Sequence, residues 1–153
     1  MRRTSRVAAY AVCIRDDDIL LARWTGGRGS PEWTLPGGGM EHGEYPHDTV
    51  LREVEEETGY LVEITGLLGV DCISRTTARR FRRTVDHHGV GLLYEARVTG
   101  GGLRHEVGGS TDLAAWHPLA DVGGLRRVGL VDVGLRLWRE RPATGRVTAQ
   151  AGE

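Results

Sequence analysis

Three glutamates lie close together in the sequence, at a spacing that can build a metal site. Glu53, Glu56 and Glu57 would share one face of a helix, beside its apolar face, at 100° per residue. Glu53 and Glu57 are one turn apart, where like charges repel by about 0.2–0.5 kcal/mol. Carboxylate oxygens on a rigid element suit a hard divalent cation, so this pattern predicts a Mg2+ site.

A glycine run precedes the glutamates. It follows the short apolar segment Trp33–Leu35, and glycine lets the backbone approach a ligand closely. Metal ligands beside such a loop predict hydrolysis at phosphorus, with a metal-bound water as nucleophile. The alternative is a solvated acidic helix after a flexible loop, which is the usual meaning of an acidic run on its own. The glycines expected to face the substrate are Gly37, Gly38 and Gly39.

The helix that carries the glutamates has clear limits in the sequence. Pro46 suits the first turn, where its missing N–H costs nothing, and Asp48 adds favourable charge there. Gly59 predicts a C-terminal stop with positive φ. The residues expected on the apolar face are Val50, Leu51 and Val54.

The whole segment from Gly38 to Tyr60 fits the pattern G-x5-E-x7-R-E-U-x-E-E-x-G-U, where U is apolar or aromatic. It resembles the signature of the Nudix hydrolase family, the MutT-like pyrophosphohydrolases. The resemblance implies an α/β fold of the Nudix type, an α/β/α sandwich with a central mixed sheet. It also implies hydrolysis of the pyrophosphate linkage of a nucleoside diphosphate derivative, with Mg2+ as cofactor and Mn2+ as the alternative ion.

The resemblance assigns roles to single residues. The expected metal ligands are Glu53, Glu56, Glu57 and the carbonyl of Gly38. Arg52 is expected to orient the carboxylates, and Glu44 and Gly59 to support the junction of loop and helix. Glu106, outside the signature, is expected as an additional ligand or as the general base, with Glu53 as the alternative base. The other carboxylates weighed for this role are Glu95 and Asp112.

Arginines are concentrated between Arg75 and Arg83, five in nine residues. Arg79 and Arg83 are expected to bind substrate phosphate, because forked arginine contacts to phosphate are strong. The alternatives are an exposed basic loop and a contact to an RNA end. Trp24, at a strand end beside a glycine-rich loop, is expected to stack on a base.

The favoured substrate is a nucleoside triphosphate, including oxidised or non-standard forms. Family members that hydrolyse ADP-ribose often carry a proline shortly after the signature, and dinucleoside polyphosphate hydrolases a tyrosine. Here no proline occurs in residues 61–117 and no tyrosine in residues 61–93. The alternatives are a hydrolase of ADP-ribose or nucleotide sugars, a non-catalytic nucleotide sensor, and a diphosphate isomerase, which would need a cysteine in the site.

Length and composition bound the domain organisation and the partners. A chain of 153 residues with 39% apolar composition predicts one domain, residues 1–141, followed by a flexible tail, residues 142–153. All 20 basic residues are arginine, yet the net charge is −1, so nucleic acid is an unfavoured partner. No apolar run is long enough to span a membrane, and a homodimer is expected from the resemblance.

Periodicity places the remaining elements. Cys13 and Cys72 lie in apolar runs and are expected to be buried thiols, which favours a cytoplasmic location. A hairpin turn is expected at residues 15–18. The expected strands are Val7–Ile14, Ile19–Arg23, Trp33–Leu35, Leu61–Ile73 (one bent strand or two), Gly91–Val98 and Leu113–Trp116, and the second helix is Val128–Arg139.

Overall fold

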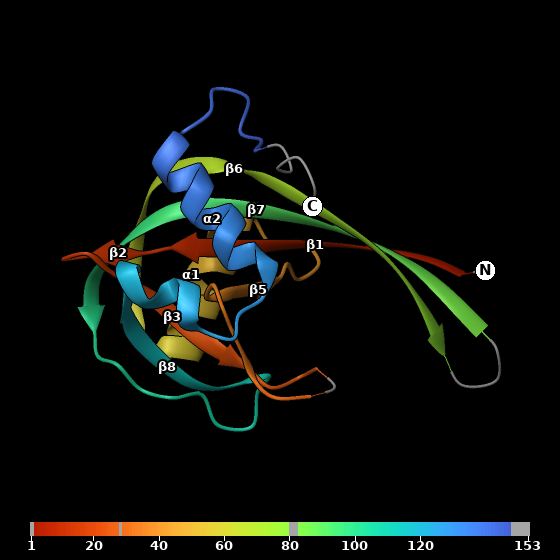
Figure 1. Cartoon of the computed structure of the whole chain (residues 1–153), viewed down its shortest axis with the longest axis horizontal. Coiled ribbons are helices and arrows are strands. Elements are labelled where there is room, and N and C mark those ends of the chain that lie inside the picture. The colour runs from red at the N-terminus through yellow and green to blue at the C-terminus, as the bar shows by residue number, and fades with distance from the viewer. Residues whose placement is uncertain (1, 28, 80–82, 148–153) are drawn as a thin grey trace.

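Two four-stranded sheets form the framework of the fold (Figure 1). The computed structural model describes the backbone of residues 2–27, 29–79 and 83–147, and the side chains of these residues except 77–79 and 83. The strands are β1 (Arg2–Val12), β2 (Ile14–Arg15), β3 (Asp18–Trp24), β4 (Glu32–Thr34), β5 (Gly37–Gly39), β6 (Tyr60–Arg79), β7 (Arg83–Gly101) and β8 (Thr111–Pro118). The first sheet has the order β5-β1-β7-β6, with β1 parallel to β7 and its other pairs antiparallel. In the second sheet, β3 pairs with β2, β4 and β8.

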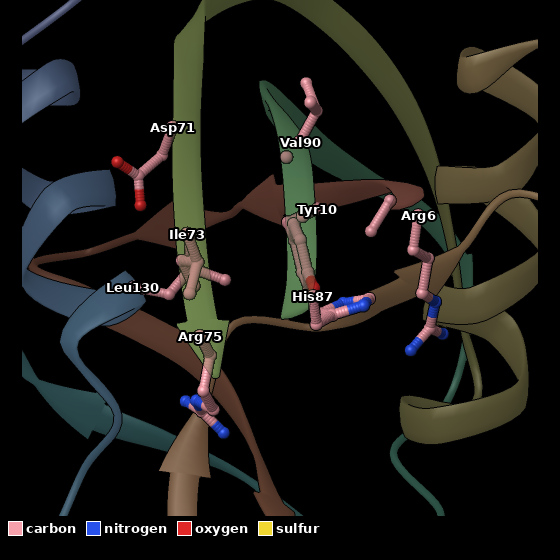
Figure 2. Close-up of a pocket in the computed structure, with 11 residues that line it drawn as sticks. Arg6, Tyr10, Asp71, Ile73, Arg75, His87, Val90 and Leu130 are labelled. Carbon is pink, nitrogen blue, oxygen red and sulfur yellow. The ribbon is translucent and has the colours of Figure 1, made fainter. Parts of the chain in front are cut away.

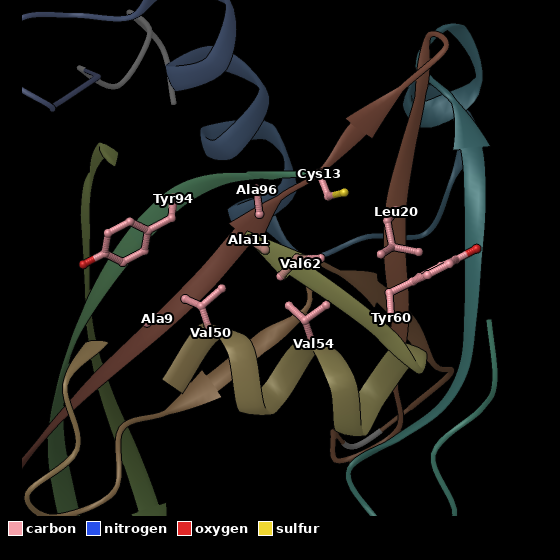
Figure 3. Close-up of a cluster of buried hydrophobic side chains, with 10 residues drawn as sticks. All are labelled: Ala9, Ala11, Cys13, Leu20, Val50, Val54, Tyr60, Val62, Tyr94 and Ala96. Atoms are coloured by element: carbon pink, nitrogen blue, oxygen red, sulfur yellow. The ribbon is translucent and has the colours of Figure 1, made fainter. Parts of the chain in front are cut away.

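Two helices cover opposite faces of the first sheet. These are α1 (Pro46–Thr58) and α2 (Gly129–Glu140), and the short 3-10 helix η2 (Leu119–Gly124) precedes α2 in the chain. Side chains alternate along β1, so Ala9 and Ala11 pack with α1 whereas Val12 packs in the cluster that includes α2. Figure 3 shows Val50 and Val54 of α1 directed at the sheet face that carries Ala9 and Ala11. The predicted α/β/α sandwich with a mixed sheet is confirmed.

Helix α1 begins and ends where the sequence predicts. Pro46 is its first residue, and Gly59 follows it with φ 82° and donates its N–H to the Glu55 carbonyl at 2.9 Å. One prediction about its faces is wrong: Leu51 is 38% exposed. Only Val50 and Val54 of the expected apolar face are fully buried.

The β6–β7 hairpin is much longer than predicted. Its ladder continues to the pair Arg79–Arg83, so residues 75–79 and the described residues from Arg83 onward are strand instead of the expected loop. The outer part of β1 pairs with it, with Arg2 opposite Val85. Together these strand ends form an arm that projects from the body of the domain (Figure 1).

Three further segments bear on the sequence predictions. The turn between β2 and β3 is confirmed, with positive φ at Asp16 and Asp17. Cys13 is buried, but Cys72 is exposed and both are free thiols, so the expected burial of the second thiol is wrong. Residues 142–147 of the predicted tail contact β6, where Val70 N–H donates to a backbone carbonyl at 2.8 Å, and residues 148–153 lie outside the described residues.

Within the described chain, no helix has the length and apolar character needed to cross a bilayer.

Candidate active site

Glu53 and Glu57 form a carboxylate pair directly beneath the glycine strand β5. Glu57 is 3% exposed and accepts the Gly37 N–H at 3.4 Å. The backbone of Gly38 lies over Glu53, since a Cβ added at this position would lie 2.9 Å from the carboxyl carbon. Any larger residue at Gly38 would therefore displace the carboxylate, so glycine is needed to bring the backbone and the acidic helix together.

The pair lacks compensating positive charge at Glu57. Burial, and then the adjacent carboxyl of Glu53, raise the pKa of Glu57 to about 10, while the Gly37 N–H acts in the opposite direction. Burial and the charge of Glu53 also raise the pKa of Glu56. A divalent cation would replace the shared proton and satisfy the buried oxygens, so the donor set fits a hard metal ion.

Arg52 fixes Glu53 from the other side. Its Nη1 donates to Glu53 at 2.8 Å, while Nε and Nη2 donate to the two oxygens of Glu44 at 2.9 and 3.0 Å. Glu44 also accepts the Thr49 hydroxyl at 2.6 Å and the Glu41 N–H at 3.1 Å. Together, Arg52 and then these two donors lower the pKa of Glu44 to about 2. These contacts support the predicted roles of Arg52 in orientation and Glu44 at the loop–helix junction.

Glu56 stands apart from the pair. Its side chain is 50% exposed and lies 3.5 Å from Arg52 Nη1. Among the described residues, no three His, Cys, Asp or Glu side chains converge as a metal cage. The structure thus brings together two of the three predicted carboxylates, and Mg2+ is commonly held by one or two carboxylates with waters and substrate phosphates.

Glu106 is close to the carboxylate pair despite lying outside the signature. Burial is the main cause of the raised pKa of Glu56 and of Glu57, and the charge of Glu106 adds to both shifts. The Thr111 hydroxyl donates to Glu106 at 2.5 Å. The other carboxylates weighed for this role are occupied elsewhere: Asp112 pairs with Arg23 at 2.8 Å, and Glu95 pairs with Arg141.

A large cleft opens from the glycine strand. It has a volume of about 1040 Å³ and is lined by Gly37, Gly38 and Glu57 on one side and by α2 on the other. Trp24, the predicted stacking residue, also lines it, although its ring packs over two glycines of its own loop. The side chains of Arg79 and Arg83 lie outside the described residues, so their predicted phosphate contacts stay predictions.

Sequence reasoning missed three residues of this cleft, Arg6, Tyr10 and Asp71, which line it together with Arg75 of the predicted arginine segment. Arg6 lies over Gly39, where a Cβ would collide with its guanidinium. The alternation of strand β1 could have placed Arg6 and Tyr10 on one face, but only the strand order shows that this face adjoins the glycines.

A model of the NUDIX domain matches residues 4–133. This chain belongs to the NUDIX domain family. The matched range includes the glycine strand, the acidic helix and Glu106. Only the part of the cleft lined by residues after 133 lies outside it.

Individual relatives agree with this assignment. A MutT-like protein of Streptomyces ambofaciens is 45% identical over 64 residues, which is 42% of this chain and 40% of that protein. A putative mutator protein MutT4 of Mycobacterium tuberculosis (strain CDC 1551 / Oshkosh) is 36% identical over 96 residues, 62% of this chain and 36% of that protein. The chain therefore spans well under half the length of these NUDIX relatives.

The fold matches solved NUDIX structures over nearly its whole length. A NUDIX hydrolase from Nitrosomonas europaea superposes with a TM-score of 0.71 at 21% identity, covering 98% of this chain and 100% of that one. At this identity the likeness establishes the fold alone.

Proposed function

We propose that the protein is a Mg2+-dependent pyrophosphohydrolase that acts on a nucleoside triphosphate. The observation that carries the proposal is the Glu53–Glu57 pair beneath Gly37 and Gly38, in which Glu57 is buried and lines a cleft of about 1040 Å³. A buried carboxylate beside a second carboxylate is costly unless a cation binds between them, and a cation beside a glycine strand suits hydrolysis at phosphorus.

Each residue of the site has a distinct part in the proposed reaction. Glu53 and Glu57 would hold the metal, with Glu56 and the Gly38 carbonyl as further ligands. When bound, Mg2+ would polarise a phosphoryl group and acidify a water. Arg52 keeps Glu53 in place through its 2.8 Å contact.

Glu106 is our choice for the group that accepts the proton of the attacking water. The Thr111 hydroxyl donates to its carboxylate at 2.5 Å and would keep it oriented for this role. Glu53 is the alternative base, but it pairs with Arg52 at 2.8 Å and is expected to bind the metal.

Arginines around the cleft support a polyphosphate substrate. Arg6, Arg75, Arg127 and Arg139 line it together with the glycine strand, and forked contacts from arginine are strong for phosphate. In this proposal Arg6 acts closest to the reaction, because it covers Gly39.

We also propose a homodimer in the cytoplasm. Two-fold dimers are the commonest soluble assemblies, and the two free thiols suit a reducing compartment. Light scattering should give twice the chain mass of 16.8 kDa, whereas a mass near one chain would refute the dimer.

A nucleotide panel tests the proposed function. Nucleoside triphosphates, ADP-ribose and nucleotide sugars are incubated with Mg2+, Mn2+ or EDTA, and mononucleotide, phosphate and pyrophosphate are quantified. We expect metal-dependent conversion of a triphosphate, lost in Glu53→Gln and kept in Glu55→Gln, which changes an exposed glutamate of the same helix. Turnover of ADP-ribose alone would overturn the substrate, and tight binding without turnover would favour the sensor.

A further inference from the structure

The first sheet carries a shallow trough on the face that is turned toward α2. Three neighbouring strands contribute every second residue to it, and the middle strand β7 contributes two glycines in succession. The residues on this face are Arg6, Ala8 and Tyr10 from β1, His87, Gly89 and Gly91 from β7, and Asp71, Ile73 and Arg75 from β6. Because Gly89 and Gly91 have no side chains, the floor of the trough is bare backbone.

The trough encloses a hollow of about 240 Å³ (Figure 2). The Tyr10 ring lies beside its floor, 3.3 Å from where a Cβ at Gly91 would be, and Leu130 of α2 lies at its edge. Ligand pockets start at about 300 Å³, so this hollow is too small for a whole nucleotide. A flat floor beside an aromatic ring suits one planar ring system.

Asp71 is the acceptor at the side of this hollow (Figure 2). Burial raises the pKa of its carboxyl, and the N–H of Cys72 offsets this only in part. Within the described part of the chain, no side chain donates a hydrogen bond to Asp71 and no arginine pairs with it at salt-bridge distance. A partly buried carboxylate with spare acceptor oxygens favours a ligand that brings its own N–H donors.

The hollow and Glu57 of the catalytic pair belong to one cleft. Asp71, Tyr10, Gly37 and Glu57 all line it, and the charge of Glu57 contributes to raising the pKa of Tyr10, although burial is the main cause. In the strand order β5-β1-β7-β6, Gly37 and Asp71 are three strand spacings apart, roughly 14 Å. An extended nucleotide can bridge that span, with Arg6 between its two ends.

We propose that this hollow is the nucleobase subsite and that Asp71 makes it selective for guanine. The guanine ring lies on Gly89 and Gly91 beside Tyr10, and its N1–H and N2–H donate to the two oxygens of Asp71. The polyphosphate passes Arg6 to reach the glycine strand. The inference rests on the proposed function, because it assumes that the reacting phosphates lie at Glu53 and Glu57.

The choice of guanine follows from donor counting. A carboxylate offers acceptors only, and guanine presents two adjacent N–H donors on one edge. Adenine and cytosine present one amino group beside a ring-nitrogen lone pair, which would face an Asp71 oxygen. Uracil and thymine place one N–H between two carbonyl oxygens, so a carbonyl oxygen of the base would face a carboxylate oxygen of Asp71.

The test compares kcat/KM for GTP, ITP and ATP in the parent, Asp71→Asn and Glu63→Gln. Two hydrogen bonds to a charged group predict a preference for GTP over ATP of about 10–100-fold, with ITP between them because it lacks the N2 amino group. Asparagine can donate as well as accept and pairs well with adenine, so Asp71→Asn should abolish or reverse the ratio. Glu63→Gln changes an exposed acid on the same strand, paired with Arg97, and should keep the parental ratio.

Gly89→Ala provides a second variant that should fold normally. A Cβ there meets nothing closer than 3.8 Å, yet it would stand on the floor of the hollow and raise KM for GTP severalfold. Equal kcat/KM for GTP and ATP in the parent, or an unchanged ratio in Asp71→Asn, would overturn the inference while leaving the proposed function intact. If the parent hydrolyses no triphosphate, the proposed function fails, and the ratio of GTP to ATP binding measured by calorimetry decides the inference alone.

Discussion

Replacing Glu57 by glutamine is expected to stabilise the metal-free protein while removing its activity. The ordinary pKa of glutamate is 4.5, whereas burial and the neighbouring Glu53 raise the pKa of Glu57 to about 10 in the folded chain. At pH 7 the unfolded chain is therefore ionised at this position, and folding must take up a proton. Glutamine has the same shape and can still accept the Gly37 N–H, but it requires no proton.

The size of the effect follows from the pH interval. Between the ordinary pKa of 4.5 and pH 7, each unit of proton uptake costs about 1.36 kcal/mol, which gives about 3 kcal/mol in total. For a chain of this size that corresponds to a rise in Tm of roughly 6–12 °C. Since the folded pKa is raised, the parent loses stability as pH rises from 4.5 toward 10, so the gap between parent and Glu57→Gln should grow with pH in that window.

Thermal unfolding in EDTA at pH 5, 7 and 9 measures this difference. Glu55→Gln, on the exposed side of the same helix, is the matched control and should unfold like the parent. Added Mg2+ should raise the Tm of the parent and leave Glu57→Gln unchanged, while kcat of the variant falls on the order of 10³-fold. A Glu57→Gln protein that is no more stable than the parent in EDTA at pH 9 would refute the reasoning.

Three further predictions concern residues around the site. Arg52→Lys keeps the charge but loses the fork that joins two glutamates, so steady-state kinetics should show kcat reduced about 10–100-fold; parental activity would contradict that role. In the native protein Cys72 should react with a thiol reagent at once, whereas Cys13, buried and with its pKa raised to about 11, should react only on unfolding; two fast thiols would contradict its burial. Gly59→Ala places a Cβ at φ 82° against a backbone carbonyl, and urea denaturation should show a loss of about 1–3 kcal/mol.

The acidic helix could be predicted because its signals are local. Pro46 and Gly59 fix its ends, and the spacing of Glu53 and Glu57 fixes their common direction. The burial of Glu57 was not predictable in the same way, because it depends on β5 lying across the helix. The spacing of the glutamates shows which side chains lie on the same face of the helix. Whether that face is exposed depends on another element, here β5, packing against it.

The long hairpin and the trough depend on contacts between distant residues. The arginine-rich run from Arg75 has the composition of a loop, and only the pairing of β6 with β7 makes residues 75–79 strand. Asp71 and Tyr10 are far apart in the sequence and meet through strand order. Cys72 lies on β6 at the edge of the sheet, which explains why a residue in an apolar run is exposed.

The central claim, that the Glu53–Glu57 pair holds the metal that drives pyrophosphate hydrolysis, is tested most directly by titrating Mg2+ into single-turnover reactions with a nucleoside triphosphate. The parent should show a rate that rises from zero in EDTA to saturation with Mg2+. Glu53→Gln and Glu57→Gln should each need far more Mg2+ or stay inactive, while Glu55→Gln follows the parent. Full activity in EDTA, or the same Mg2+ dependence in all four proteins, would contradict the claim.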